Sequence, residues 1–256
     1  MTVCNTMAPA GFQKIPGFEG TDYAYLNGEI VWAGERAATD HPRNALSMWQ
    51  PETASFKADS LVEGALICRA LLSSNNAFAC QTKGLLLWLQ NDEMPFPMNL
   101  SATRFDAIKV ALVANNLDAF KTAALRVIGL GNGLTPSGDD FVGGIFFALV
   151  QSPRSAWIEE LPAVKMQIHD AAKGLTNVIS AALLDDMMAG WSYGVLHDVL
   201  IALDSQNAKK ISATCQKLLT IGSTSGADIL AGLLLALTTQ KISSPHSENS
   251  NYAKIE

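Results

Sequence analysis

Residues 128–141 read Ile-Gly-Leu-Gly-Asn-Gly-Leu-Thr-Pro-Ser-Gly-Asp-Asp-Phe, and the apolar run 142–150 follows them. Three glycines occupy alternate positions from 129 to 133, which gives a loop whose backbone can adopt left-handed conformations and approach a ligand closely. The pattern Ser137-x-x-Asp140 then indicates a capping box, with Ser137 as the N-cap of a helix that contains the apolar run. We therefore expect a glycine-rich loop that leads directly into a buried helix.

The beginning of this helix is a candidate binding site for an anion. The first amide groups of a helix lack internal partners and lie at the positive end of its dipole, and a glycine-rich loop can add further donors. Asp139 and Asp140 would repel an anion unless a cation, such as Mg²⁺ or a basic side chain, lies between them. We therefore predict a ligand site over residues 131–140, with Mg²⁺ as a candidate cofactor at the two aspartates. The predicted ligand-binding residues of this segment are Gly131, Asn132, Gly133, Thr135, Ser137 and Gly138.

The motif occurs a second time in the chain. Residues 135–149 align without a gap on residues 223–237, with six identical pairs where ordinary composition gives about one by chance. The second copy contains its own capping box, so we predict that two similar helix starts face one site, with Ser225, Gly226 and Asp228 as its other wall. The identical pairs are Ser137/Ser225, Gly138/Gly226, Asp140/Asp228, Gly144/Gly232, Ala148/Ala236 and Leu149/Leu237.

The two motifs also have a purely structural explanation. A capping box stabilises any helix by about 1 kcal/mol, so capping alone could account for the serines and for Asp140 and Asp228. It does not account for Asp139 or for the longer first loop, which costs chain entropy without adding to the core. Small residues would let the two helices pack closely; these are Gly143, Gly144, Ala231 and Gly232.

Residues 174–180, Gly-Leu-Thr-Asn-Val-Ile-Ser, provide a second group of candidate ligand-binding residues. Thr176 and Ser180 are four positions apart and would share a helix face, with Asn177 beside them. The alternative is that this segment only caps the next helix and leaves an exposed polar shoulder.

Composition excludes several classes of protein. The chain of 256 residues is 48% hydrophobic and 16% charged, as in a globular protein with a large core. Its net charge of -6, without a cluster of lysines and arginines, argues against a nucleic-acid-binding surface. No run reaches the roughly 18 apolar residues that a membrane span needs, and the N-terminus has no signal-peptide pattern. We therefore expect a cytoplasmic protein that binds neither nucleic acid nor membranes.

Several familiar catalytic patterns are missing from the sequence. There is no Gly-Lys-Ser/Thr phosphate loop, no Gly-x-Ser-x-Gly elbow and no His-Glu-x-x-His. The cysteines, at positions 4, 68, 80 and 215, have neither metal-type nor redox-type spacing and predict free thiols. His41 and Arg43 could bind an acidic substrate, although loop residues of this kind are more often without a ligand.

The predicted fold class is α+β, in three parts. Residues 1–100 form a small N-terminal mixed α/β part, in which residues 23–32 alternate around Asn-Gly as in a β-hairpin. In the same part Asp59 or Ser60 caps a helix that contains Leu61 to Leu72, and residues 84–89 form a strand. Residues 101–242 carry apolar residues at helical spacing and form a mainly α-helical bundle that contains the glycine-rich loop. Residues 243–256 are polar and form a disordered tail.

The run 128–141 resembles a bacterial family that includes AllH, a subunit of the oxamate carbamoyltransferase of anaerobic allantoin breakdown. Two downstream motifs share in this resemblance, Leu175-Thr-Asn-x-x-Ser180 and Ile221-Gly-x-x-Ser-Gly-x-Asp228. The resemblance covers about residues 104–240 and does not extend to the first hundred residues.

The resemblance implies a cytoplasmic hetero-oligomer. AllH-like chains act with two other transferase subunits to interconvert oxalurate plus phosphate with oxamate plus carbamoyl phosphate, so the ligand is a small anionic or carboxylate substrate. In this hypothesis the loop residues and the serine contact the ligand. Asp139 and Asp140, with Asp228, hold a cation or orient a substrate amide and are the candidate catalytic residues.

Two other functions remain open from the sequence. The chain could be a non-catalytic scaffold or regulatory subunit, whose loop completes a site on a partner. It could also act on a different small carboxylate or amide, because members of one family need not share a substrate.

Overall fold

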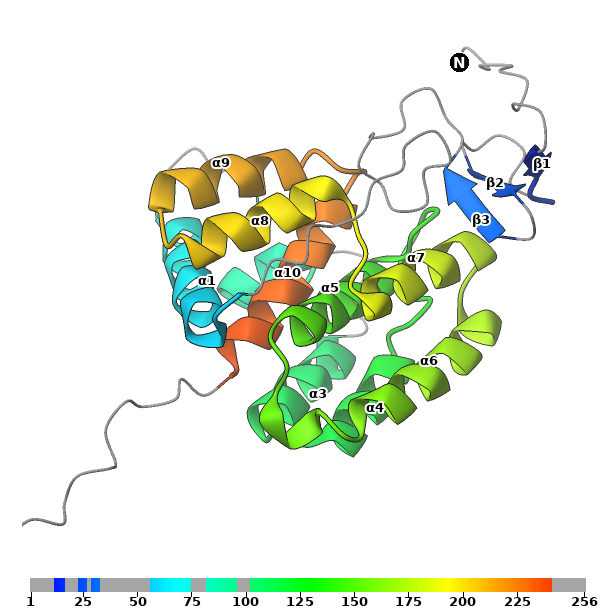
Figure 1. The fold of residues 1–256 in the computed structure, drawn as a ribbon, viewed down its shortest axis with the longest axis horizontal. Helices are drawn as coiled ribbons and strands as arrows, with labels where there is room; N and C mark the ends of the chain where they lie inside the picture. Colours follow the sequence, from blue (N-terminus) through cyan, green and yellow to red (C-terminus); the bar gives the residue numbers. More distant parts are fainter. Residues whose placement is uncertain are drawn as a thin grey trace, which may run out of the picture.

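In the computed structural model the chain is mostly α-helical (Figure 1). The structure describes residues 12–16, 23–26, 29–32, 56–74, 82–95 and 102–240. The first helices are α1 (Ala58–Leu72), α2 (Leu85–Asn91), α3 (Ala102–Val113), α4 (Leu117–Leu125) and α5 (Ser137–Gln151). They are followed by a 3-10 turn (Ser155–Trp157), α6 (Leu161–Leu175), α7 (Val178–Ala189), α8 (Gly194–Asp204), α9 (Ala208–Leu218) and α10 (Ser225–Thr238). The strands are β1 (Phe12–Lys14), β2 (Tyr23–Leu26) and β3 (Glu29–Trp32).

Helices α5 and α10 form the centre of the molecule and pack against each other over their length. Figure 1 shows α1, α8 and α9 on one side of this pair and α4, α6 and α7 on the other. Residues 138–149 of α5 and 226–237 of α10 are all buried. A helix that is apolar on every face must be enclosed by other elements, and these two runs supply the two central helices.

Glycines allow the central helices to approach each other. A Cβ atom on Gly144 would lie 2.2 Å from the carbonyl oxygen of Ile229, and one on Gly232 would lie 2.0 Å from that of Phe141. The predicted close packing of α5 on α10 is therefore confirmed. Gly143 serves a different contact, because its Cβ would lie 2.4 Å from Sδ of Met187 in α7.

The strand predicted at residues 84–89 is wrong, because Gly84 directly precedes α2 and residues 85–89 belong to it. Four of its five apolar side chains are buried, and the ring of Trp88 lies 5.8 Å from that of Phe141 in α5. A short apolar run fits a buried strand or a buried helix equally well. Packing against α5 and α10 therefore decides this element.

The mixed α/β part predicted for residues 1–100 is not supported, and the fold is mainly helical. Helices α1 and α2 belong to the same hydrophobic core as α5 and α10. Sγ of Cys68 in α1 lies 3.7 Å from Sγ of Cys215 in α9, and both buried cysteines are free thiols. The strands are short, and they pair antiparallel in the order β1-β2-β3.

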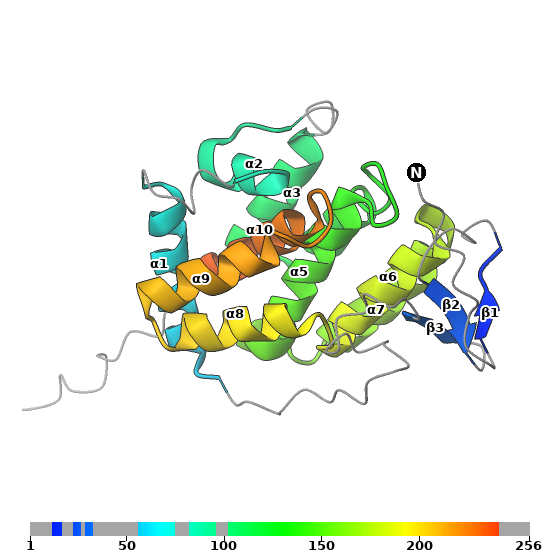
Figure 2. The same ribbon diagram turned by 90° about the horizontal axis from the view of Figure 1, so that it is seen from above.

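The strands lie against α7 (Figure 2). Ile15 and Ile30 form a small buried cluster with Ile179 and Leu183 of α7, and Leu134 of the glycine-rich loop packs against it. This cluster holds the C-terminal half of the loop against the helical core.

Some predictions fall at or beyond the limits of the described residues. The helix predicted after Asp59 or Ser60 is present as α1, but the predicted cap is wrong, because α1 begins at Ala58 after Lys57 and has no side-chain cap. Other predictions concern residues that lie outside the described ranges, namely Asn27-Gly28, His41, Arg43, Cys4, Cys80 and the tail 243–256.

Candidate functional site

Helices α5 and α10 begin with the same local structure. Helix α5 begins at Ser137 after Pro136, and α10 begins at Ser225 after Thr224. Neither of the preceding residues makes a side-chain capping bond. The two predicted capping boxes are wrong, because each serine is the first residue of its helix and not the residue before it.

The first-turn amides of both helices already have backbone partners. The N–H of Gly138 donates to the carbonyl oxygen of Leu130 at 2.8 Å, and the next two amides donate to that of Pro136 at 2.9 and 3.2 Å. In α10 the N–H of Gly226 donates to Ile221 O at 3.1 Å. These amides are therefore not the anion donors that the helix start predicted.

The second residue of each helix is a glycine for a steric reason. A Cβ atom on Gly138 would lie 1.8 Å from Val127 O, and one on Gly226 would lie 1.9 Å from Leu218 O. These two glycines, predicted as ligand-binding, are buried. Their role in the structure is to let the preceding turn pack onto the helix start.

The two motifs meet where α5 and α10 begin. Oγ1 of Thr135 lies 2.9 Å from Oγ of Ser225. Hydrogen bonds from Ser225 and Thr135 lower the pKa of Asp140, and one from Ser137 lowers the pKa of Asp228. Each serine thus acts on the aspartate of the other helix. The two helix starts therefore lie together, as the prediction of one shared site requires.

Asp140 and Asp228 are 7% and 0% exposed. Burial raises the pKa of Asp228 to about 6. Burial also raises the pKa of Asp140, and the charge of Asp228 raises it further. The Oδ2 atoms of both aspartates have no hydrogen-bond partner among the described residues. The pair therefore has hydrogen-bonding capacity that these residues do not satisfy.

Helix α2 contributes groups that sequence reasoning missed. The N–H of Leu85, the first residue of α2, donates to Oδ1 of Asp228 at 2.6 Å. Gly84 precedes it with φ of 56°, and a Cβ there would lie 2.3 Å from the same oxygen. The charge of Lys83 lowers the pKa of Asp228. The sequence feature that indicates this helix N-terminus is a glycine directly before an apolar run. Because the run was predicted to be a strand, the helix N-terminus was not predicted.

Asp139 points to different partners from those of Asp140. Its Oδ1 accepts from Gly129 N–H at 2.6 Å, and its Oδ2 accepts from Ser180 Oγ at 2.6 Å and from Thr176 Oγ1. Burial raises its pKa, and these hydrogen bonds oppose that effect. The two polar side chains predicted from residues 174–180 are thus brought to the first motif, where they bind Asp139.

Asn177 links α7 to the loop. Its side-chain oxygen accepts from the amides of Ile179 and Ser180, so Asn177 is the N-cap of α7, as the structural alternative for this segment implied. Its Nδ2 donates to Leu134 O at 2.8 Å. This single side chain begins α7 and holds the second half of the glycine-rich loop.

The tip of the loop presents backbone amides. Gly131 and Gly133 have φ of 121° and 104°, in the region that favours glycine, and residues 132–133 are exposed. None of the amides of residues 131–135 donates to a described residue. Asp139 nevertheless holds Gly129, just before this segment, and Asn177 holds Leu134 within it. The loop is therefore held in place, and its backbone N–H groups are available to a ligand.

The arrangement of the aspartates does not fit the predicted Mg²⁺ ion. The carboxylate of Asp139 already accepts three hydrogen bonds from the protein. Within the part of the chain that the structure describes, no group of three or more His, Cys, Asp and Glu side chains could hold a metal ion. Asp140 and Asp228 lie at the positive ends of helix dipoles, which disfavour a cation. We assign no reaction step to a metal ion.

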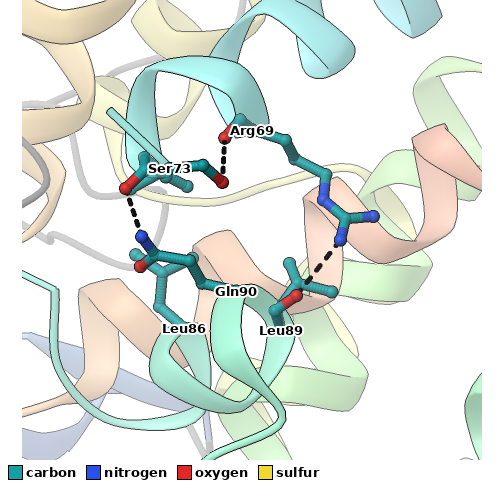
Figure 3. A pocket seen from close by; sticks show the side chains of 6 residues that line it. Arg69, Ser73, Leu86, Leu89 and Gln90 are labelled. Carbon is teal, nitrogen blue, oxygen red and sulfur yellow. Dashed lines mark hydrogen bonds between the residues drawn. The ribbon is translucent and has the colours of Figure 1, made fainter. Parts of the chain in front are cut away.

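A small surface hollow lies elsewhere, at the C-terminal ends of α1 and α2 (Figure 3). Its polar groups bond to one another: Arg69 donates to Leu89 O, Ser73 donates to Arg69 O, and Gln90 donates to Leu72 O. These hydrogen bonds satisfy carbonyl oxygens in the last turns of the two helices. The hollow includes no residue of the two motifs.

Comparison with known proteins places the two motifs in one family. Residues 127–237 match the family described as oxamate carbamoyltransferase subunit AllH, and this range runs from the glycine-rich loop to α10. No curated protein and no solved structure matches the chain. Within the described ranges, no helix has the length and apolar character to cross a membrane. The resemblance inferred from the motifs is confirmed over residues 127–237, which match the AllH family model.

Proposed function

We propose that the chain is a subunit of a carbamoyltransferase-type enzyme that resembles oxamate carbamoyltransferase. The reaction is the interconversion of oxalurate and phosphate with oxamate and carbamoyl phosphate. The family match supports this proposal, because the description of the family names a subunit of that enzyme. The chain acts in a cytoplasmic hetero-oligomer with other transferase subunits, as the family resemblance implies.

The observation that carries the proposal is the glycine-rich loop. The amides of residues 131–135 donate to no described residue, while Asp139 holds Gly129 just before this segment and Asn177 holds Leu134 within it. A fixed loop with unused N–H groups is suited to a phosphate or carboxylate group. The ligand-contacting residues of the proposal are Gly131, Asn132, Gly133, Thr135 and Ser137.

Carbamoyl transfer suits this chemistry. An oxygen of phosphate forms a bond to the carbamoyl carbon of oxalurate, and the bond from that carbon to the nitrogen of oxamate breaks, so this nitrogen takes up a proton. Negative charge develops on the carbamoyl oxygen during the step. Preorganised N–H groups stabilise such charge, and loss of one such donor typically slows a reaction by about 10²- to 10³-fold.

The aspartates act through the loop and the helix starts in this proposal. Asp139 holds Gly129 and α7 together, and Asp140 orients the hydroxyls of Thr135 and Ser225. They are positioning residues. An Asp140→Asn variant that is folded but keeps full activity in the complete enzyme would contradict this assignment.

The test is phosphate-dependent cleavage of oxalurate, measured with the partner subunits alone, this chain alone, and the reconstituted complex. We expect cleavage only in the complex. Full activity of the partners alone would leave this chain a scaffold or regulatory subunit. Cleavage of a different small carboxylate or amide in preference to oxalurate would overturn the substrate assignment.

Two glycine variants locate the ligand within the complex. We expect Gly133→Ala to reduce kcat/KM at least about tenfold, because alanine disfavours φ of 104° and shifts the loop amides. Gly174→Ala is the matched control: a Cβ at either position meets no atom within 4 Å, but only Gly133 has a positive φ. Equal activity of the two variants would place the ligand elsewhere.

A further inference from the structure

Two buried carboxyl oxygens, Oδ2 of Asp140 and Oδ2 of Asp228, have no hydrogen-bond partner among the described residues. Both aspartates are the fourth residue of their helices, in the two copies of one motif. The two groups are close enough for the charge of Asp228 to raise the pKa of Asp140. An unsatisfied buried polar atom is costly, so both oxygens need a hydrogen-bond donor.

The charged surroundings do not balance two negative charges. Asp139, on the same helix as Asp140, adds a third carboxyl group whose charge raises the pKa of Asp140. Lys83, next to α2, is the cation whose charge acts on Asp228. The loop, α7 and α10 contribute hydroxyl groups to the three aspartates and no described cation. The positive ends of α5 and α10 help to hold one buried carboxylate.

We propose that Asp140 and Asp228 share one proton, so that the O–H of one carboxyl group donates to Oδ2 of the other. One proton supplies the donor that both unpartnered oxygens lack. It also reduces the charge of the pair from two to one, which is the usual outcome when two carboxyl groups share a buried site. The hydroxyls of Thr135, Ser137 and Ser225 then donate to the remaining carboxyl oxygens.

The proton replaces the cation that the sequence predicted between the carboxylates. A divalent ion would need further oxygen ligands, and among the described residues no group of three or more His, Cys, Asp and Glu side chains could hold one. The proton needs only the two oxygens that are present. The shared proton also removes one negative charge from the Asp140–Asp228 pair, which reduces repulsion of an anionic ligand at the loop. Only this consequence depends on the proposed function.

The test is the infrared spectrum of the purified full-length chain at neutral pH, with a metal chelator present. We expect a carboxylic-acid C=O band that is lost in both Asp140→Asn and Asp228→Asn. The band is lost because the amide N–H of asparagine donates to the remaining carboxylate and takes the place of the proton. Asp106→Asn, at an exposed position of α3, is the control and keeps the band.

Several results would overturn the shared proton. They are no acid band in the wild type, a band that survives in both variants, and a band that is lost only in Asp139→Asn. Loss of the band on addition of Mg²⁺ in place of the chelator would show a metal site instead. The wild-type spectrum decides even if a variant does not fold. The measurement uses neither ligand nor partner subunits, so a failed oxalurate assay would leave this result standing.

Discussion

Replacing Asp228 by asparagine should stabilise the protein at alkaline pH. The pKa of this buried carboxyl group is about 6, against an ordinary value of 3.8. The folded protein therefore binds this proton more tightly than the unfolded chain does. Ionisation of Asp228 therefore lowers the free energy of unfolding. This destabilisation is zero well below pH 3.8 and reaches its full value above about pH 6.

The magnitude follows from these two pKa values. At 1.36 kcal/mol for each tenfold change in proton affinity, the rise from 3.8 to about 6 corresponds to about 3 kcal/mol at pH 8. About half of this remains at pH 5, and about 0.5 kcal/mol at pH 4. Asparagine carries no charge, and its side-chain oxygen can still accept from the N–H of Leu85. We therefore expect the stability of Asp228→Asn relative to wild type to rise by about 2–3 kcal/mol between about pH 4 and pH 8.

The assay is urea unfolding of the wild type and the variant across this pH range, with thermal unfolding as a second measure. A chain of this size should show a relative Tm shift of roughly 4–12 °C for 2–3 kcal/mol. Asp106→Asn removes an exposed carboxyl group and corrects for the change in net charge. Stability curves that stay parallel to wild type from pH 4 to pH 8 would refute the argument, because a pH-independent difference cannot come from this carboxyl group.

Three further predictions concern the frame of the site and the core. Gly144→Ala should lower the free energy of unfolding by about 1–3 kcal/mol in urea, because its Cβ would lie 2.2 Å from a carbonyl oxygen of α10, whereas Gly174→Ala should not. Asp139→Asn should cost about 2–3 kcal/mol and increase amide hydrogen exchange around Gly129, because its Nδ2 cannot accept from Thr176 and Ser180. Arg154→Leu should lower the free energy of unfolding by at least about 2 kcal/mol, measured by thermal unfolding. The reason is that the buried guanidinium donates to Leu112 O at 2.7 Å and to Thr239 Oγ1 at 2.6 Å. Unchanged stability of any of these variants, or unchanged hydrogen exchange in Asp139→Asn, would contradict the corresponding prediction.

The central helices could be predicted from the sequence. The run after Asp140 and the run after Asp228 are apolar on every face, and their internal repeat indicated a related pair. Gly144 and Gly232 predicted the close contact, and the structure has it. These features depend on residue type and on spacing along one helix, which a sequence contains directly.

Helix ends were harder, because the same residues permit two local structures. Ser137 and Ser225 fit the pattern of N-caps, yet each became the first helical residue when backbone carbonyls satisfied the first-turn amides. Asn177 fits the same pattern and is an N-cap. The apolar run at 84–89 was compatible with a strand until its contacts with α5 and α10 selected a helix.

The partners of the buried aspartates were decided by the tertiary structure. Asp228 accepts from Leu85, 143 positions earlier, and Asp139 accepts from Ser180, 41 positions later. The sequence by itself determined that acidic residues, serines and glycines stand at two helix starts. The folded chain determined which carboxyl group each donor serves, because a hydrogen bond depends on atoms within about 3 Å and that proximity arises only when α2, α5, α7 and α10 pack together.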